Sequence, residues 1–374
     1  MSNATASATH AMWREIHEQP EALTNTLALY VDADRLRPDF LAAVDSWLGE
    51  SRSIIIAASG SSRHAALHGK AMIEALGGVA TQVQYASEYA LAAANPPADA
   101  AVMVISQSGE TADSLQALRL ANGRGCRTLA ITNVRGSRMA LEATVGLCTE
   151  AGPERAIPAT KSFVTQLLLV HLVALAVAAD RGARTSAEVS TAVKRLRQVP
   201  WLLHTQLQQD SQAVQLSAER CLEATPLVYL GRGLHYALAC EGALKLKETA
   251  YVPAEAMPTG ELKHGPIAML GEAAYLIVLA TRDPADTESL RRYEKTTELL
   301  RELRTREVDV LAIATQGDEQ IGSLTSRVIF TPTASEPLSP FMAIAPLQLL
   351  AYHAAVMKGV DVDRPRNLVK SVRE

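Results

Sequence analysis

Charged residues interrupt an otherwise small and apolar stretch in the second half of the chain. Glu241, Lys245 and Glu248 recur at the i, i+4, i+7 spacing that places side chains on one face of a helix. Lys263 and His264 follow in a second motif. Carboxylate, amine and imidazole groups are the ones that transfer protons in enzymes, so the stretch indicates a reaction centre. The alternative is a solvated helix face with an ion pair worth roughly a few tenths of a kcal/mol.

A second group of residues is suited to binding an anion. Residues 106–111 (SQSGET) carry three hydroxyls and a glycine immediately before a predicted helix at 112–121. The first N–H groups of a helix lack partners and carry partial positive charge, and Gly109 permits close backbone approach. A monoester phosphate fits this chemistry. The alternative is a simple cap, in which Ser108 or Thr111 closes the helix and the adjacent glutamate favours its dipole.

Other loops offer weaker signals. Ser62 follows the first predicted strand and either adds a hydroxyl to the same pocket or lies in an ordinary turn. Residues 154–161 lead into a long apolar helix, where Thr160 either closes the site or caps the helix. Residues 231–233 (GRG) resemble the start of a dinucleotide fingerprint but lack its third glycine. No phosphate-loop, HExxH or clustered metal-ligand spacing is present, so we expect neither a metal nor a cofactor.

The composition is that of a globular protein whose charge does not favour a highly charged binding partner. Its 374 residues are 48% hydrophobic and 20% charged, with a net charge of −4 from well-mixed acidic and basic residues. This balance predicts no binding to nucleic acid or to an anionic membrane surface. Cysteines 126, 148, 221 and 240 lack CxxC spacing, so we expect buried free thiols rather than disulfides or zinc ligands.

The N-terminal twenty residues have polar and charged groups where a secretory signal needs an apolar core, which predicts a cytoplasmic protein. The most apolar segment, residues 166–179, is too short for a membrane span and contains His171. We expect a buried helix there.

The sequence repeats itself. Strand signals and glycine turns of the first half recur in the second half at an offset of 173, which grows to 182 after the second strand. The paired strand signals are 53–58 with 227–230, 100–105 with 273–278, and 128–131 with 310–313. Residues 166–171 match residues 348–353 at the later offset. The repeat therefore predicts two similar β-α-β-α units.

We predict an α/β protein with two tandem doubly wound, flavodoxin-like domains built on parallel sheets. Strands that are apolar on both faces fit sheets covered by helices on both sides. The predicted boundaries are an N-terminal helical segment at 1–40, domains at 41–195 and 196–358, and a tail at 359–374. Ligands in such folds bind at the carboxyl ends of the strands.

Five motifs carry a resemblance to a known family: SQSGET at 106–111, EGALKLKE at 241–248, GELKHGP at 260–266, PLQLLAYH at 346–353 and DVDRPRNLVKSV at 361–372. In this order they resemble the isomerase half of the glucosamine-6-phosphate synthases, within the sugar isomerase (SIS) superfamily. The segment at 12–20 is similar to the one that opens that half. The resemblance covers nearly the whole chain and points to the hexosamine branch.

The resemblance implies roles for individual residues. The sugar phosphate would be held by Ser62, Ser106, Gln107, Ser108 and Thr111, with Ile157 and Ala159 lining the site through their backbones. Glu248 would move a proton between sugar C1 and C2, with Lys245 as its supporting cation. His264 would assist ring opening. Lys370 would meet the open-chain carbonyl as an amine. The family also implies a homodimer in which the His264 loop reaches the neighbouring subunit.

These roles make chemical sense. A carboxylate can take and return one proton without a metal, and a histidine titrates near neutrality. A lysine amine forms a Schiff base with a ketose, although Lys370 alone would pass for a solvated tail lysine. We expect the two domains to contribute to one site.

The synthases have a glutaminase half with an N-terminal cysteine, whereas this chain starts just before the isomerase half and has no cysteine before Cys126. We therefore expect isomerising deamination of glucosamine 6-phosphate to fructose 6-phosphate and ammonia. The alternatives are the synthetic direction, deglycation or another sugar-phosphate isomerisation on the same site, and a sensor that binds a sugar phosphate without turnover.

Overall fold

The structure is a computed structural model that describes residues 10–91, 99–209 and 212–372. The first nine residues of the predicted N-terminal segment and the last two of the predicted tail lie outside the described residues. The chain forms two compact units. Unit N comprises residues 18–154, 159–200 and 369–372, and unit C comprises residues 10–17, 155–158 and 201–368.

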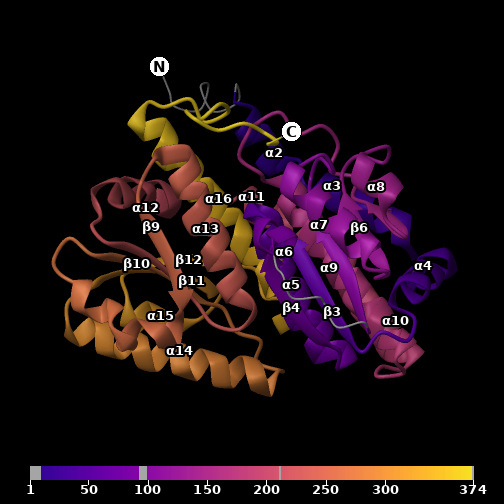
Figure 1. The fold of residues 1–374 in the computed structure, drawn as a ribbon. Helices are drawn as coiled ribbons and strands as arrows, with labels where there is room; N and C mark the ends of the chain where they lie inside the picture. The colour runs from indigo at the N-terminus through magenta and orange to yellow at the C-terminus, as the bar shows by residue number, and fades with distance from the viewer. Residues whose placement is uncertain (1–9, 92–98, 210–211, 373–374) are drawn as a thin grey trace. The chain divides into compact units, whose positions relative to one another are not determined.

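Unit N contains a five-stranded sheet whose strands are all parallel, in the order β4-β3-β5-β6-β7. The strands are β3 (Ser53–Ala58), β4 (Ala80–Tyr85), β5 (Ala100–Ile105), β6 (Thr128–Thr132) and β7 (Val145–Cys148). A two-stranded antiparallel ribbon is formed by β1 (Val31–Asp32) and β2 (Arg35–Leu36). Figure 1 shows helices on both faces of the sheet.

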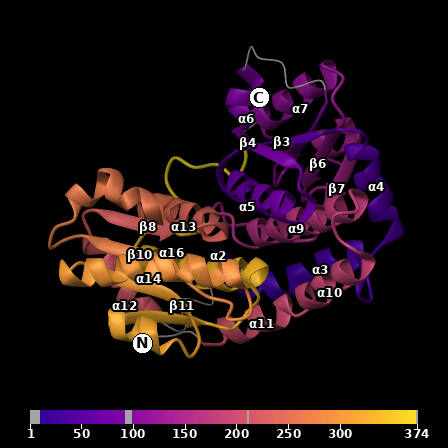
Figure 2. The same cartoon turned by 90° about the horizontal axis from the view of Figure 1, so that it is seen from below.

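The helices assigned to unit N are α3 (Gln19–Tyr30), α4 (Pro38–Leu48), α5 (Gly60–Gly77), α6 (Ala86–Leu91), α7 (Ala112–Gly123), α8 (Arg138–Glu142), α9 (Lys161–Asp180) and α10 (Ser186–Leu196). The α5 and α9 helices lie side by side in both Figure 1 and Figure 2. Their close approach depends on Gly69, because a Cβ there would lie 3.1 Å from Cβ of Val170. This tight pair covers one face of the sheet.

Unit C repeats the same topology, with the order β12-β11-β10-β8-β9 and only parallel pairs. Its strands are β8 (Leu227–Gly231), β9 (Ala254–Pro258), β10 (Tyr275–Ala280), β11 (Asp309–Thr315) and β12 (Arg327–Thr331). Its helices are α2 (Ala11–His17), α11 (Val199–Leu207, from residue 201 onward), α12 (Gln212–Glu223), α13 (Leu234–Ala250), α14 (Thr287–Thr305), α15 (Glu319–Leu324) and α16 (Ser339–Lys358), with short 3₁₀ turns η1 (Thr259–His264), η2 (Pro266–Met269) and η3 (Glu336–Leu338).

Both sheets therefore follow the flavodoxin-like strand order 2-1-3-4-5, and the predicted fold class is confirmed. The strand order reverses between β3 and β5 in unit N, and between β8 and β10 in unit C. Ligands in open α/β sheets bind at such points, beyond the carboxyl ends of the strands. The loops after these four strands are thus where each unit is suited to hold a ligand.

One strand begins later than the sequence predicts. The signal at 273–278 becomes β10 at Tyr275–Ala280, because the N–H of Ala274 closes a turn onto the Gly271 carbonyl at 3.0 Å. Pairing starts only at Tyr275, whose N–H donates to the Pro226 carbonyl.

In the part of the chain that the structure describes, two helices are long and apolar enough to cross a membrane, at 161–180 and 336–358, but 94% and 83% of their apolar windows are buried inside the protein. The segment at 166–179 lies within α9, so the predicted buried helix is confirmed. All four cysteines are free; Cys221 is buried and the other three are partly buried.

Candidate functional site

The loop between β5 and α7 in unit N gathers its hydroxyls. The hydroxyls of Ser106 and Thr111 lie 3.0 Å apart, and the Gly109 N–H donates to Ser106 Oγ at 3.2 Å. Thr111 is the N-cap residue of α7 but makes no side-chain capping bond. The capping alternative therefore does not account for its hydroxyl, which faces Ser106 instead. We name residues 106–111 the hydroxyl loop.

Gly109 is required by the shape of this loop. Its φ of +64° is one that L side chains rarely adopt, and a Cβ there would lie 2.2 Å from the Ser137 hydroxyl. Because Gly109 has no side chain, the loop backbone can approach the turn before α8 closely; any other residue at position 109 would clash with Ser137.

The carboxylate in the hydroxyl loop is directed away from it. Glu110 accepts from the Arg138 backbone N–H at 2.8 Å and from Arg138 Nε at 2.7 Å. The negative charge of Glu110 is thus paired with the Arg138 guanidinium and with a backbone N–H in the first turn of α8. This leaves hydroxyls and backbone N–H groups as the principal polar groups of the loop, which suits an anion.

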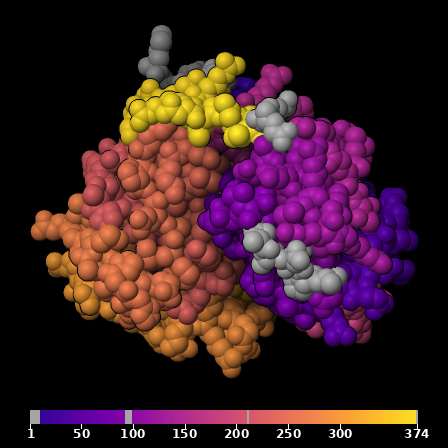
Figure 3. Space-filling view, viewed as in Figure 1, coloured from indigo at the N-terminus to yellow at the C-terminus, as the bar shows by residue number. Residues whose placement is uncertain are grey.

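The C-terminal tail runs beside the hydroxyl loop. Ser371 Oγ lies 3.0 Å from Ser108 Oγ, and the Val372 carbonyl accepts from the Ala112 N–H at 3.1 Å. Lys370 Nζ lies 2.5 Å from Glu154 Oε2 in the same unit. The tail therefore brings Lys370 into the unit that carries the hydroxyl loop. Figure 3 shows the last part of the chain, in yellow, at the surface of the molecule.

The remaining predicted phosphate residues are distributed over both units. Ser62 lies in the first turn of α5, directly after β3. Gln107 is half-buried, and its carbonyl accepts from the Asn133 N–H. Ala159 belongs to unit N, whereas Ile157 belongs to unit C, where its N–H donates to the Asp363 carbonyl at 2.9 Å.

The charged stripe lies on α13 in unit C. The Glu241 and Lys245 side chains are 0% and 1% exposed, and Glu248 is 22% exposed. Lys245 Nζ lies 2.5 Å from Glu248 Oε2 and 3.5 Å from Glu241 Oε1. The alternative of a solvated helix face is therefore wrong for the first two residues.

Burial of this stripe has a chemical consequence. A buried ammonium costs several kcal/mol unless it is paired, and here one cation lies between two carboxylates. Glu241 and Lys245 are out of reach of water, whereas Glu248 keeps one edge accessible. The stripe thus presents a single carboxylate, held by a buried cation, to whatever lies beside α13.

The two residues of the KHGP motif differ in environment. Lys263 forms a surface ion pair with Glu302 of α14, which takes it out of the candidate site. His264 is exposed at the end of η1, and within the described residues no hydrogen bond joins it to Lys245 or Glu248. The structure therefore places His264 in the same unit as the stripe, without a hydrogen bond to Lys245 or Glu248 among the described residues.

The equivalent edge of unit C is closed by side chains. His235 Nε2 lies 2.7 Å from Thr281 Oγ1 and 3.1 Å from Ser339 Oγ, and all three residues are buried. Arg292 forms a bidentate pair with Glu336, with both N···O distances at 2.7 Å. We name these five residues the closed edge. It fills the place where the hydroxyl loop lies in unit N.

The structure shows that two acidic residues, Glu241 and Glu154, are buried, which their spacing in the sequence does not predict. The helical spacing predicts that Glu241 lies on the charged stripe, but its burial depends on tertiary packing, which the spacing does not reveal. The sequence shows Glu154 only as part of a loop, whereas in the structure its side chain is completely buried beside Lys370. A signal was present in its surroundings, since Thr160 and Ser162 supply hydroxyls at the start of an apolar helix.

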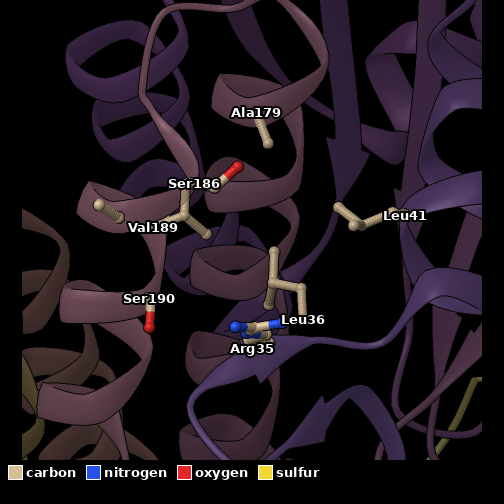
Figure 4. Close-up of a pocket in the computed structure, with 8 residues that line it drawn as sticks. Arg35, Leu36, Leu41, Ala179, Ser186, Val189 and Ser190 are labelled. Atoms are coloured by element: carbon tan, nitrogen blue, oxygen red, sulfur yellow. The ribbon is translucent and has the colours of Figure 1, made fainter.

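A cavity of about 510 Å³ lies elsewhere in unit N, and Figure 4 shows it in close-up. Its lining is mostly small and apolar, and contains none of the predicted site residues; it comprises Arg35, Leu36, Leu41, Ala179, Ser186, Ala187, Val189 and Ser190. Among residues 10–91, 99–209 and 212–372, no three His, Cys, Asp or Glu side chains converge as a metal site requires.

Two parallel sheets of one topology, one with a hydroxyl loop and the other with a charged helix, define a double α/β protein of the sugar isomerase type. The sequence matches the SIS domain family twice, over residues 48–176 and 222–358. The chain belongs to this family.

Individual members of the family are similar to this chain over nearly its whole length. The chain is 40% identical over 370 residues to the glutamine–fructose-6-phosphate aminotransferase (isomerizing) of Chlorobaculum tepidum, which covers 97% of this chain and 58% of that protein. The chain thus spans little more than half the length of that relative.

Solved structures agree. The C-terminal domain of glucosamine-fructose-6-phosphate aminotransferase from Francisella tularensis matches with a TM-score of 0.88 and 32% identity, covering 96% of this chain and 98% of that one. A glucosamine-6-phosphate deaminase from Thermotoga maritima shares the fold, with a TM-score of 0.71 at 21% identity over 97% of this chain and all of that one.

Proposed function

We propose that the chain is an enzyme that catalyses the isomerising deamination of glucosamine 6-phosphate to fructose 6-phosphate and ammonia. The observation that carries the proposal is the Lys245–Glu248 pair, in which a buried cation holds a partly accessible carboxylate. The relatives, whose names describe isomerising enzymes of amino-sugar phosphates, support the substrate class.

In this proposal the phosphate binds the hydroxyl loop, with Ser106, Gln107, Ser108 and Thr111 as donors and Ser62 beside them. Ile157 and Ala159 contribute backbone contacts. A phosphate at the start of α7 gains from the partial positive charge there and from charge-assisted hydrogen bonds.

The proton chemistry falls to Glu248. Ring opening, assisted by His264, exposes the C1 aldehyde of the amino sugar. Glu248 then takes the proton from C2 and returns it to C1, which converts the C2 amine into an imine. Water adds to this imine and ammonia leaves, so that a ketone remains at C2. Lys370 adds to that ketone as an amine in the reverse reaction.

Direction follows from mass action. In this scheme the site exchanges ammonia with the solution. At low free ammonia the release of ammonia is favoured. The second candidate is the synthetic direction, which the names of the 40% identical relatives favour. It uses the same groups, so fructose 6-phosphate with added ammonium tests it directly. We place the reaction in the cytoplasm.

The test is coupled detection of ammonia and fructose 6-phosphate from glucosamine 6-phosphate. We expect Glu248→Gln to lower kcat by about 10²- to 10⁴-fold, which is the usual contribution of a general base. Glu255→Gln, at an exposed carboxylate of β9 in the same unit, serves as the control and keeps full activity. Folded wild-type protein that produces neither ammonia nor fructose 6-phosphate, in either direction, would refute the proposal.

We also propose that the active form is a homodimer in which His264 serves the neighbouring subunit. Its exposure and its lack of a hydrogen bond to Glu248 support this. Mixing inactive Glu248→Gln and His264→Ala chains should then restore about a quarter of wild-type activity, because half of the dimers are mixed and each has one intact site. No recovery in exchanged dimers would assign His264 to its own subunit.

A further inference from the structure

Glu154 is a completely buried carboxylate with two oxygens in different roles. Oε1 accepts the backbone N–H groups of Thr160 and Ser162 at 2.9 and 3.0 Å, which are the partnerless donors at the start of α9. Oε2 accepts from the Ser162 hydroxyl and from Lys370 Nζ, both at 2.5 Å. Capping the helix therefore explains one oxygen only.

The second oxygen is held for a cation. Burial alone would raise the pKa of Glu154, but the Lys370 ammonium and the hydrogen bonds from Lys370 and Ser162 keep that pKa below its ordinary value. The carboxylate is thus ionised, and an ionised buried carboxylate requires a partner. Lys161, the first residue of α9, pairs with Glu18 instead, at 2.7 Å.

The residues that follow Lys370 in the tail contact a different part of unit N from Lys370 itself. Its neighbours Ser371 and Val372 bond to the start of α7 through a hydroxyl and a carbonyl. The Lys370 side chain is 27% exposed, so it is partly accessible, while its Nζ lies 2.5 Å from Glu154 Oε2.

We propose that Glu154 is a positioning residue for Lys370 that also carries its proton while Lys370 adds to the substrate carbonyl. This inference rests on the proposed function, in which Lys370 forms a Schiff base with the open-chain ketose.

The steps balance. The ammonium transfers a proton to Glu154, and the free amine attacks the C2 carbonyl carbon; the nitrogen proton moves to the former carbonyl oxygen, which gives a carbinolamine. Glu154 then returns its proton to the departing hydroxyl, and water leaves. The product is a protonated imine next to a carboxylate. Because the imine carries the same positive charge as the ammonium, Glu154 keeps a counter-cation at the beginning and at the end.

The test traps the imine. Protein is incubated with fructose 6-phosphate and cyanoborohydride over a range of pH, and the reduced adduct on the Lys370 peptide is quantified by mass spectrometry. We expect Glu154→Gln to slow trapping about 10²-fold at the optimum of the wild type. The acid limb of its pH profile should move to lower pH by about one to three units, because the ammonium loses its carboxylate partner.

Glu18→Gln is the matched control, since it removes the partner of the adjacent Lys161 and leaves Lys370 untouched. It should trap at a rate within about twofold of the wild type, with an unmoved acid limb. A Glu154→Gln protein that traps slowly but keeps the wild-type acid limb would reduce Glu154 to a helix cap and overturn the inference. Absence of any adduct at Lys370 in folded wild type would instead refute the assignment of Lys370 itself.

Ser162→Ala keeps the inference testable if Glu154→Gln does not fold. Removing the Ser162 hydroxyl leaves more negative charge on Oε2 for Lys370, so the acid limb should move to higher pH, by about half a unit. An unmoved limb in this variant counts against the inference.

Discussion

The carboxyl edges of the two sheets share a topology but hold different contents. In unit N the loop after β5 keeps the Ser106 and Thr111 hydroxyls close together, with Glu110 turned toward Arg138. In unit C, Thr281 in the loop after β10 lies against His235, and its carbonyl accepts from Arg292, which also pairs with Glu336. The strand order determines where a ligand would bind, whereas the side chains determine whether that place is open or filled.

The helices that follow the first strand of each unit show the opposite difference. At the repeat offset of 173, Lys245 and Glu248 of α13 correspond to Met72 and Ala75 of α5 (245 − 173 = 72; 248 − 173 = 75). Met72 is buried and apolar where unit C places a buried cation. Unit N therefore has its polar groups in the loop after β5, whereas unit C has them on α13. The equivalent places are occupied by the closed edge in unit C and by buried Met72 in unit N, so two copies of one fold supply different chemistry.

The largest expected effect tests whether the closed edge is structural. Arg292 is 7% exposed and its pair with Glu336 is nearly buried, so Arg292→Leu should lower the free energy of unfolding by about 3 to 5 kcal/mol. KM for the sugar phosphate should change less than about twofold. Urea denaturation and steady-state kinetics measure the two quantities.

The adjacent Arg291 provides the control, because its ion pair with Glu288 is exposed. Arg291→Leu should change stability by less than about 0.5 kcal/mol. A large KM effect of Arg292→Leu would show that the closed edge binds substrate, and the contrast between the two edges would be lost.

The next effect concerns α9, whose His171 corresponds to His353 of α16 at the offset of 182. Burial lowers the pKa of His171 to about 4, and burial together with His171 holds the pKa of His68 well below its ordinary range. Both are neutral in the folded state, whereas the unfolded chain takes up their protons below about pH 6.5. Stability is therefore fully present above that pH and is lost as pH falls toward 4.

Between pH 7.5 and 5 we expect a loss of about 2 to 4 kcal/mol in the free energy of unfolding, measured with urea. His171→Gln should remove roughly half of this loss. His204→Gln, at an exposed histidine, should leave the pH dependence unchanged. Equal losses in the wild type and His171→Gln would contradict the explanation.

A smaller pair of effects compares equivalent hydroxyls. Ser108 and Thr281 stand at the same offset (281 − 108 = 173). Ser108→Ala should raise KM by about tenfold through one lost charge-assisted hydrogen bond and leave stability nearly unchanged. Thr281→Val should lower stability by about 1 to 2 kcal/mol, because His235 loses a buried partner, without raising KM. If both variants behaved alike, the two edges would not differ in role.

The smallest effect is expected at Lys263. Its pair with Glu302 is exposed, so Lys263→Ala should change stability by less than about 0.5 kcal/mol and leave kcat unchanged. A substantial loss of kcat, measured by ammonia release, would return the lysine of the KHGP motif to the site.

Much of the fold could be predicted, because central parallel strands are buried on both faces and have a continuous apolar signal. The strands at 53–58 and 100–105 were predicted with the bounds of β3 and β5. The edge strands β4 and β9 were not predicted; each has one protected side at most, and their mixed polar sequences resemble loops. Packing, not periodicity, decides such strands.

For the site, local chemistry was easier to predict than contact. The hydroxyl loop lies within one short segment, so its sequence was sufficient. The pairing of Lys370 with Glu154 joins residues 216 positions apart and depends on where the tail is bound. A single sequence contains no signal for such a long-range pair. The roles of Glu248, His264 and Lys370 remain predictions that the experiments above test.

The way the chain is divided between its units has a consequence for inheritance. Unit C consists of three separate stretches of the chain. Unit C ends at residue 368, and the residues from 369 onward belong to unit N. A recombination event that exchanged one contiguous half of the gene would therefore transfer an incomplete unit, without its helix α2 or without Lys370. The two copies can diverge by point mutation, but they have to be passed on together.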